Sequence, residues 1–188
     1  MIVEIALGVT VLAASSLATR AWWARRSARE RAAERPAHAP VRGPGLHPGD
    51  VVMIAGSELA LDRSSELDDG GVLRVLETIA AEPRYLVQLD PAAERVVLAT
   101  PYAELPEGRV ADVVVLEGRT LTLARRGEAA ARPVSADREG LLTGRVRFTV
   151  LADRGGRHLV VLEPDSAPRL VLTGDLLDRR LIDVLPGR

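Results

Sequence analysis

The 188-residue sequence contains no cysteine, which excludes disulfide bonds, thiolate zinc sites and cysteine nucleophiles. It also contains no lysine, so all 25 basic residues are arginine and no lysine is available to a phosphate-binding loop. Aromatic residues make up 3% of the chain, against 47% for hydrophobic residues as a whole. The core must therefore be built from valine, leucine, isoleucine and alanine, and surfaces for stacking are scarce.

Charge is distributed unevenly along the chain. Residues 1–40 hold six arginines and three glutamates, a net charge of +3, and the remaining 19 basic and 23 acidic residues give −4 for residues 41–188. A mildly acidic, aromatic-poor body is unlike nucleic-acid-binding domains, so we expect no nucleic-acid partner. The length suits one domain, or two small units that share a core, plus an appendage.

The first 24 residues are predicted to form a transmembrane helix. The run "IVEIALGVTVLAASSLAT", residues 2–19, carries Glu4 as its one charge, and about 20 mostly apolar helical residues cross a bilayer. The alternative is a cleaved signal peptide, because Ser16-Leu17-Ala18 has the small-x-small form of a cleavage site. Against that alternative, the segment begins with an acidic rather than a basic residue, and arginines follow it.

A group of side chains after this run is expected at the membrane–water interface. The group is Arg20, Trp22, Trp23, Arg25 and Arg26. Indole rings favour the headgroup zone, and arginine extends its guanidinium outward along an apolar stem. Because positive charge follows the helix and does not precede it, the positive-inside rule predicts a cytoplasmic C-terminal domain. Residues 25–45 then form a basic helical extension and a proline-rich linker.

Two stretches of the body repeat one another. "VVMIAGSELALDRSSEL" begins at Val51 and "VVVLEGRTLTLARRGEA" at Val113, with valine, glycine, leucine, arginine and glutamate at matching places. Further along, "RYLVQLDP" from Arg84 matches "RHLVVLEP" from Arg157. The offset grows from 62 to 73 residues, so the second copy contains eleven extra residues within 127–144. We predict that this insertion is a loop.

Each copy begins with a predicted β-hairpin. Gly56-Ser57 and Gly118-Arg119 separate alternating apolar runs, which is the pattern of a tight two-residue turn. With these turns, Ile54 would lie opposite Leu59, and the second copy would pair in the equivalent register. One face of each hairpin is then continuously apolar and belongs to the core.

The matching stretches from Arg84 and Arg157 are each followed by a second apolar run, "RVVLAT" from Arg95 and "RLVLTG" from Arg169, and predict a second hairpin in each copy. A further strand is predicted before each of these hairpins, at 72–76 and 145–151, which gives about five strands per copy. We therefore predict a mainly β fold, an internally duplicated antiparallel β barrel or sandwich domain preceded by one N-terminal transmembrane helix. The repeats span 46–108 and 109–188. Neither buries its apolar face alone, so 46–188 is expected to be one domain with a shared core, either one closed barrel or two packed ones.

Several short motifs resemble a bacterial family, the domain of unknown function 4178 (DUF 4178). They are "LHPGDVV" from Leu46 with the glycine hairpin after it, "YLVQLD" from Tyr85, "GRHLVVLE" from Gly156 and the closing Pro186-Gly187. The resemblance covers about 46–187 and implies the duplicated β topology. Some members similarly look anchored by one N-terminal helix and a proline-rich linker. Because the family has no assigned activity, the resemblance implies a fold rather than a function.

Candidate catalytic and metal-binding residues are few. His158 aligns with Tyr85 in the repeat, so we interpret it as a half-buried strand side chain rather than a base or ligand. The acidic stretch 66–71 brings three carboxylates together without the spacing of a calcium loop, and we interpret it as a solvated turn. We predict no catalytic residue, no metal ligand and no cofactor.

The sequence favours a binding function. Arginines at 125, 126, 132 and 138 alternate with acidic residues and are interpreted as a mixed surface loop. Together with the membrane tether, the pattern predicts a single-pass protein of the cell membrane whose duplicated β domain is a cytoplasmic binding or scaffolding module for a membrane-associated protein. The alternative is a small-molecule sensor with a pocket between the repeats. An enzyme, the least favoured class, would depend on His158 or on the Asp68/Asp69 pair.

Overall fold

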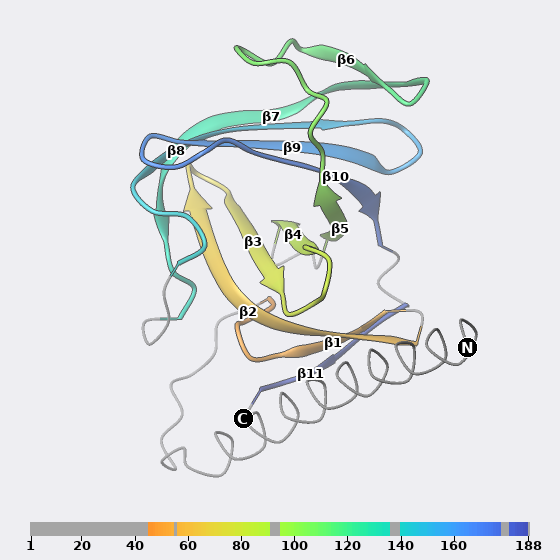
Figure 1. The fold of residues 1–188 in the computed structure, drawn as a ribbon, viewed down its shortest axis with the longest axis vertical. Helices are drawn as coiled ribbons and strands as arrows, with labels where there is room; N and C mark the ends of the chain where they lie inside the picture. Colours follow the sequence, from red (N-terminus) through yellow and green to blue (C-terminus); the bar gives the residue numbers. More distant parts are fainter. Residues whose placement is uncertain (1–44, 55, 91–94, 136–139, 178–180, 188) are drawn as a thin grey trace, which may run out of the picture. The chain divides into compact units, whose positions relative to one another are not determined.

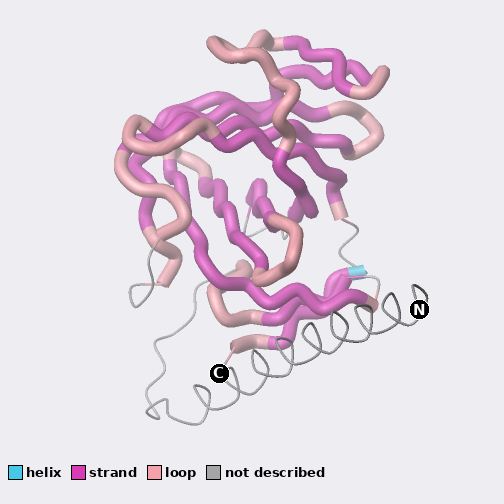
Figure 2. The backbone as a smooth tube through the Cα atoms, viewed as in Figure 1, coloured by secondary structure: helices cyan, strands magenta, loops and turns pink. Residues whose placement is uncertain are grey.

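The computed structural model describes residues 45–54, 56–90, 95–135, 140–177 and 181–187. Within these ranges the chain consists of strands joined by turns and loops, apart from a short helical piece at Leu181 (Figure 2), which confirms the mainly β prediction. The strands are β1 (Val51–Ile54), β2 (Ser57–Asp68), β3 (Val72–Thr78), β4 (Tyr85–Asp90), β5 (Arg95–Pro101), β6 (Val113–Leu116), β7 (Arg119–Arg132), β8 (Arg145–Ala152), β9 (Arg157–Pro164), β10 (Leu170–Leu176) and β11 (Ile182–Leu185).

The predicted membrane helix over 1–24 and the extension and linker over 25–45 lie outside the described residues, apart from Gly45. In the described ranges, no helix has the length and apolar character needed to cross a bilayer. The strands belong to one compact unit, Arg42–Pro186.

All eleven strands form one antiparallel sheet (Figure 1). Neighbouring strands pair in the order β11-β1-β2-β3-β4-β5-β10-β9-β8-β7-β6. β2 also pairs with β7, where Glu66 lies opposite Arg132 and Leu67 opposite Ala131. This extra pairing closes the strands from β2 to β7 into a ring, and it leaves β6 on one side and β1 with β11 on the other as extensions.

The two junction strands, β2 and β7, are the longest because each pairs both outside and inside the ring. The first part of β2 pairs with β1 and the rest with β3, and an irregularity in register separates Leu61 from Ser64. β7 pairs first with β6 and then with β8, with a similar irregularity between Leu123 and Arg125. Bulges of this kind bend a strand and increase its twist. The bulges in β2 and β7 therefore direct each outer hairpin away from the strands of the ring.

Three clusters of buried aliphatic side chains stabilise this arrangement. The first fills the ring with residues from both halves, among them Leu67, Val87, Phe148 and Leu162. The second lies between the β1–β2 hairpin with β11 and the outer face of β3–β5, and the third lies between the β6–β7 hairpin and the outer face of β8–β10. The outer hairpin of each half thus covers the strands of its own half, joined over the first half by β11 from the second, and the interior of the ring needs both halves.

The halves meet at β5 and β10, where Ala99 lies opposite Gly174. A Cβ atom on Gly174 would overlap the Leu98 carbonyl oxygen and would lie 2.7 Å from the Ala99 Cα atom. Glycine at this position therefore lets the two central strands approach closely.

The predicted hairpin register is wrong by two residues in both copies. Val52, not Ile54, lies opposite Leu59, and Val114, not Leu116, lies opposite Leu121. The turn residues in the second copy are Glu117 and Gly118, with φ of 50° and 76°. A turn with positive φ at both central residues matches the twist of the strands, and the glycine occupies its second rather than its first position. A shift of two residues leaves the same face in the core, as predicted.

Two other predictions are corrected by the structure. The loop predicted within 127–144 is narrower than that range: Gly127–Arg132 belong to β7, which pairs with β8 as far as Ala130, and the described residues of 133–144 lie outside the strands. β11, which the sequence did not predict, adds to the free side of β1. The strands expected near 72–76 and 145–151 are confirmed as β3 and β8. The internal duplication stays a prediction.

Candidate functional site

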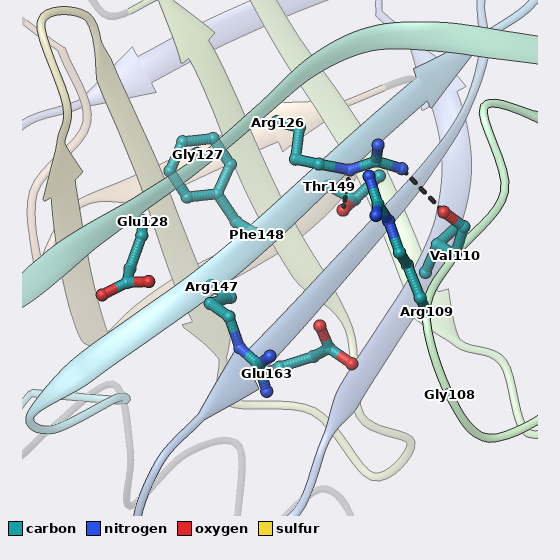
Figure 3. Close-up of a pocket in the computed structure, with 10 residues that line it drawn as sticks. All are labelled: Gly108, Arg109, Val110, Arg126, Gly127, Glu128, Arg147, Phe148, Thr149 and Glu163. Atoms are coloured by element: carbon teal, nitrogen blue, oxygen red, sulfur yellow. Dashed lines mark hydrogen bonds between the residues drawn. The ribbon is translucent and has the colours of Figure 1, made fainter.

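A cavity of about 460 Å³ lies on the second half of the domain (Figure 3). Its walls come from β7, β8 and β9 and from the segment between β5 and β6. The lining residues are Gly108, Arg109, Val110, Arg126, Gly127, Glu128, Arg147, Phe148, Thr149 and Glu163. Strand alternation explains the chemistry of the walls: Arg147 and Thr149 alternate with Phe148 and Val150, which point into the ring core, so they point away from it.

Arg126 fixes the segment that covers one side of the cavity. Its Nη2 atom donates to the Val110 carbonyl oxygen at 2.7 Å, and its Nη1 atom lies 2.8 Å from Asp112 Oδ1. Its Nε atom donates to Thr149 Oγ1 at 3.3 Å. Figure 3 shows these bonds to Val110 and Thr149, with the Arg109 guanidinium beside that of Arg126. One arginine therefore holds the covering segment against β8.

Arg147 lies between two glutamates that are engaged elsewhere. It is opposite Glu128 on β7 and Glu163 on β9. Glu128 instead pairs with Arg145 at 2.9 Å, and Glu163 lies 3.6 Å from Arg169 Nε. Among the described residues, neither the Arg147 nor the Arg109 side chain forms an ion pair or a hydrogen bond. Both guanidinium groups are therefore available at the mouth of the cavity.

The cavity is locally positive although the body is acidic. Three arginines (109, 126 and 147) and two glutamates (128 and 163) line it, which leaves a net charge of +1. The two glutamates also lie beside Arg145 and Arg169, which are outside the lining. Arg169 itself donates through Nη1 to the Pro106 carbonyl oxygen at 2.8 Å, in the segment between β5 and β6. Guanidinium groups bind carboxylates and phosphates through paired, charge-assisted hydrogen bonds. The arrangement is suited to an anionic group.

The residues predicted at the membrane interface, Arg20, Trp22, Trp23, Arg25 and Arg26, lie outside the described residues. His158, predicted to be a half-buried strand side chain, lies on β9 and is 3% exposed, so it is fully buried. Its Nδ1 atom is 2.8 Å from the Gly156 carbonyl oxygen. Burial lowers the pKa of His158, because the charged imidazolium is poorly solvated there. It does not line the cavity.

The acidic stretch 66–71 does not gather its carboxylates. Glu66 pairs with Arg74 at 2.6 Å, Asp68 accepts a hydrogen bond from the Gly70 amide at 3.0 Å, and Asp69 pairs with Arg125. The part of the chain that the structure describes holds no group of three potential metal ligands. The predicted solvated turn is limited to residues 69–71, because 66–68 belong to β2 and Leu67 there is fully buried. Asp69 in this turn pairs with Arg125 from the other half.

The cavity residues were not predicted as a group from the sequence. Arg125 and Arg126 were assigned to a surface loop, whereas both lie on β7 and point to opposite sides of it. Arg125 pairs with Asp69 and lies 5.1 Å from the centre of the Phe148 ring, while Arg126 faces the cavity. Side chains alternate between the two sides of a strand, so the sequence 125–129 indicates which residues face the cavity. This inference requires that residues 127–132 are assigned to a strand and not to a loop.

Comparison with known proteins gives no relative. No protein-family model, no characterised protein and no solved structure matches the chain. The resemblance to the DUF 4178 family therefore stays a prediction.

Proposed function

We propose that the protein is a membrane-tethered binding module whose arginine-lined cavity holds an acidic segment of a membrane-associated partner protein. Residues 1–24 supply the tether, and the domain faces the cytoplasm. The observation that carries the proposal is the pair of guanidinium groups, Arg109 and Arg147, at a cavity in which each glutamate already faces another arginine. An incoming carboxylate would meet donors that have no other partner in the described residues.

The small-molecule alternative uses the same cavity. A volume of about 460 Å³ falls within the range of about 300–1,000 Å³ that is usual for small-ligand sites. The lining residues all come from positions 108–163, so such a ligand would bind to the second half rather than between the repeats. A small multivalent anion would suit these walls.

The test is the thermal unfolding of the full-length protein with a hexaglutamate peptide, with hexalysine as the charge-reversed probe. At ten times its dissociation constant, a ligand of the folded state adds about 1.4 kcal/mol of stability, which raises the midpoint by about 3–6 °C. We expect this rise with hexaglutamate and none with hexalysine. A rise with inorganic phosphate or citrate but not with hexaglutamate would favour the small-molecule alternative.

Matched variants decide where the probe binds. Arg147→Ser removes an exposed guanidinium from the cavity, and Arg154→Ser removes one from the exposed turn after β8. Hexaglutamate should stabilise Arg154→Ser as it does the wild type, and Arg147→Ser much less. Equal stabilisation of both variants would show binding elsewhere and would contradict the proposal.

A further inference from the structure

The β6 strand has one side without a partner among the described strands. β6 pairs with β7, with Val113 opposite Thr122 and Val115 opposite Thr120. The Leu123 amide donates to the Asp112 carbonyl oxygen at 2.8 Å. Because hydrogen-bonded and non-hydrogen-bonded pairs alternate in an antiparallel ladder, the N–H and C=O groups of Val113 and Val115 point away from β7. The strand therefore presents a row of backbone donors and acceptors.

The equivalent side of the first hairpin is occupied. Val51 and Met53 precede Val113 and Val115 by the 62-residue offset, and they have the same outward-pointing backbone groups. There β11 adds as an antiparallel strand, with Leu185 opposite Val51 and Asp183 opposite Met53. In the first half, β11 therefore pairs with the open side of β1. In the second half, the equivalent side of β6 has no pairing strand among the described residues.

The exposed face at this edge is apolar and uncharged. The side chains of Val113 and Val115 are 54% and 69% exposed, and their neighbours on β7 are Thr120 and Thr122. Natural edge strands are usually protected by charges, bulges or proline. None of these lies within Val113–Leu116.

We propose that β6 pairs with β6 of a second copy of this chain about a two-fold axis through Val114. In this antiparallel register, Val113 of one copy lies opposite Val115 of the other, so the free backbone groups of both residues are satisfied reciprocally. Four exposed valines then form one apolar cluster. Like charges do not meet across the seam, because Glu117 lies beside Ala111 and Asp112 beside Leu116 of the second copy. The edge is therefore complementary to itself.

The test is disulfide cross-linking of the full-length protein, which has no cysteine of its own. Val114→Cys places one thiol from each copy at the two-fold axis, in a non-hydrogen-bonded pair where Cβ atoms come closest. Thr122→Cys is the control, since it lies on the neighbouring strand of the same hairpin. We expect at least ten times more disulfide-linked dimer from Val114→Cys. Equal yields would overturn the proposal.

A second change tests whether the backbone edge makes the contact. Val115→Pro removes an N–H group that points away from β7, so it blocks strand addition while keeping the hairpin bonds. In the Val114→Cys background it should lower the dimer yield at least tenfold, with an unchanged circular dichroism spectrum. If that variant does not fold, Val115→Lys decides, because a charge at the edge opposes pairing. An unchanged yield in the folded variant would overturn the proposal.

Discussion

At the residue scale, the position of His158 in the β-sheet determines its burial and therefore its ionisation. It lies in one row with Gly174, Ala99 and Tyr85 across β9, β10, β5 and β4. This row crosses the join between the halves inside the ring. A histidine held there is enclosed by strands from both halves, so its ionisation is coupled to the folding of the domain.

This coupling predicts a pH dependence of stability. Because burial lowers the pKa of His158 in the folded protein, its neutral form favours folding. The associated stability is fully present above the unfolded pKa of about 6.5 and is lost as the pH falls below it, by up to about 1.4 kcal/mol at pH 5.5. His158→Gln should lose this part of the pH dependence between pH 7.5 and 5.5, as measured by urea unfolding. If the variant and the wild type lose equal stability over this range, His158 is not the group responsible.

At the element scale, the second hairpin turn contains a local conflict. Glu117 has φ of 50°, a conformation that non-glycine residues adopt at a cost of about 1 kcal/mol. Its carboxylate pairs with Arg157 at 3.0 Å, and Arg157 also lies 3.0 Å from Asp175. An exposed ion pair contributes little. The backbone conformation, not the charge, should therefore dominate the energetics of this turn.

Glu117→Asn should stabilise the domain, because asparagine followed by glycine is a preferred sequence for this turn. Glu117→Gln is the control, since it removes the charge but keeps a side chain that disfavours positive φ. We expect the asparagine variant to exceed the glutamine variant by about 0.5–1 kcal/mol in free energy of unfolding. A more stable glutamine variant would show that the turn is not limited by its backbone.

Hairpins and strands were predictable to the extent that their signals are local. The alternation at 72–76 and 145–151 correctly predicted β3 and β8. The position of glycine within the turn was misjudged, because the alternating pattern fits two registers that differ by two residues. β11 and the β2–β7 pairing depend on contacts between residues far apart in the sequence, and the local pattern has no information on them. The cavity was missed for the same reason, since its walls come from four segments.

At the scale of the whole molecule, the domain is one sheet that closes on itself and has two unequal ends. One end is completed by β11 and the other ends at β6. The arginine-lined cavity lies on the same half as the free edge of β6. A partner bound at the cavity and a second copy at the edge would use different strands of that half, so the two proposals can be tested separately.

We propose above that this domain binds a partner protein through its arginine-lined cavity. The most direct test is a cross-linked, detergent-solubilised pull-down of the full-length protein, read by mass spectrometry, with the Arg109→Ser/Arg147→Ser double variant and the Arg154→Ser control alongside. We expect the wild type and the Arg154→Ser control to recover the same partner protein. The double variant should not recover it. Recovery of the same proteins by the double variant, or no specific protein with the wild type, would contradict the proposal.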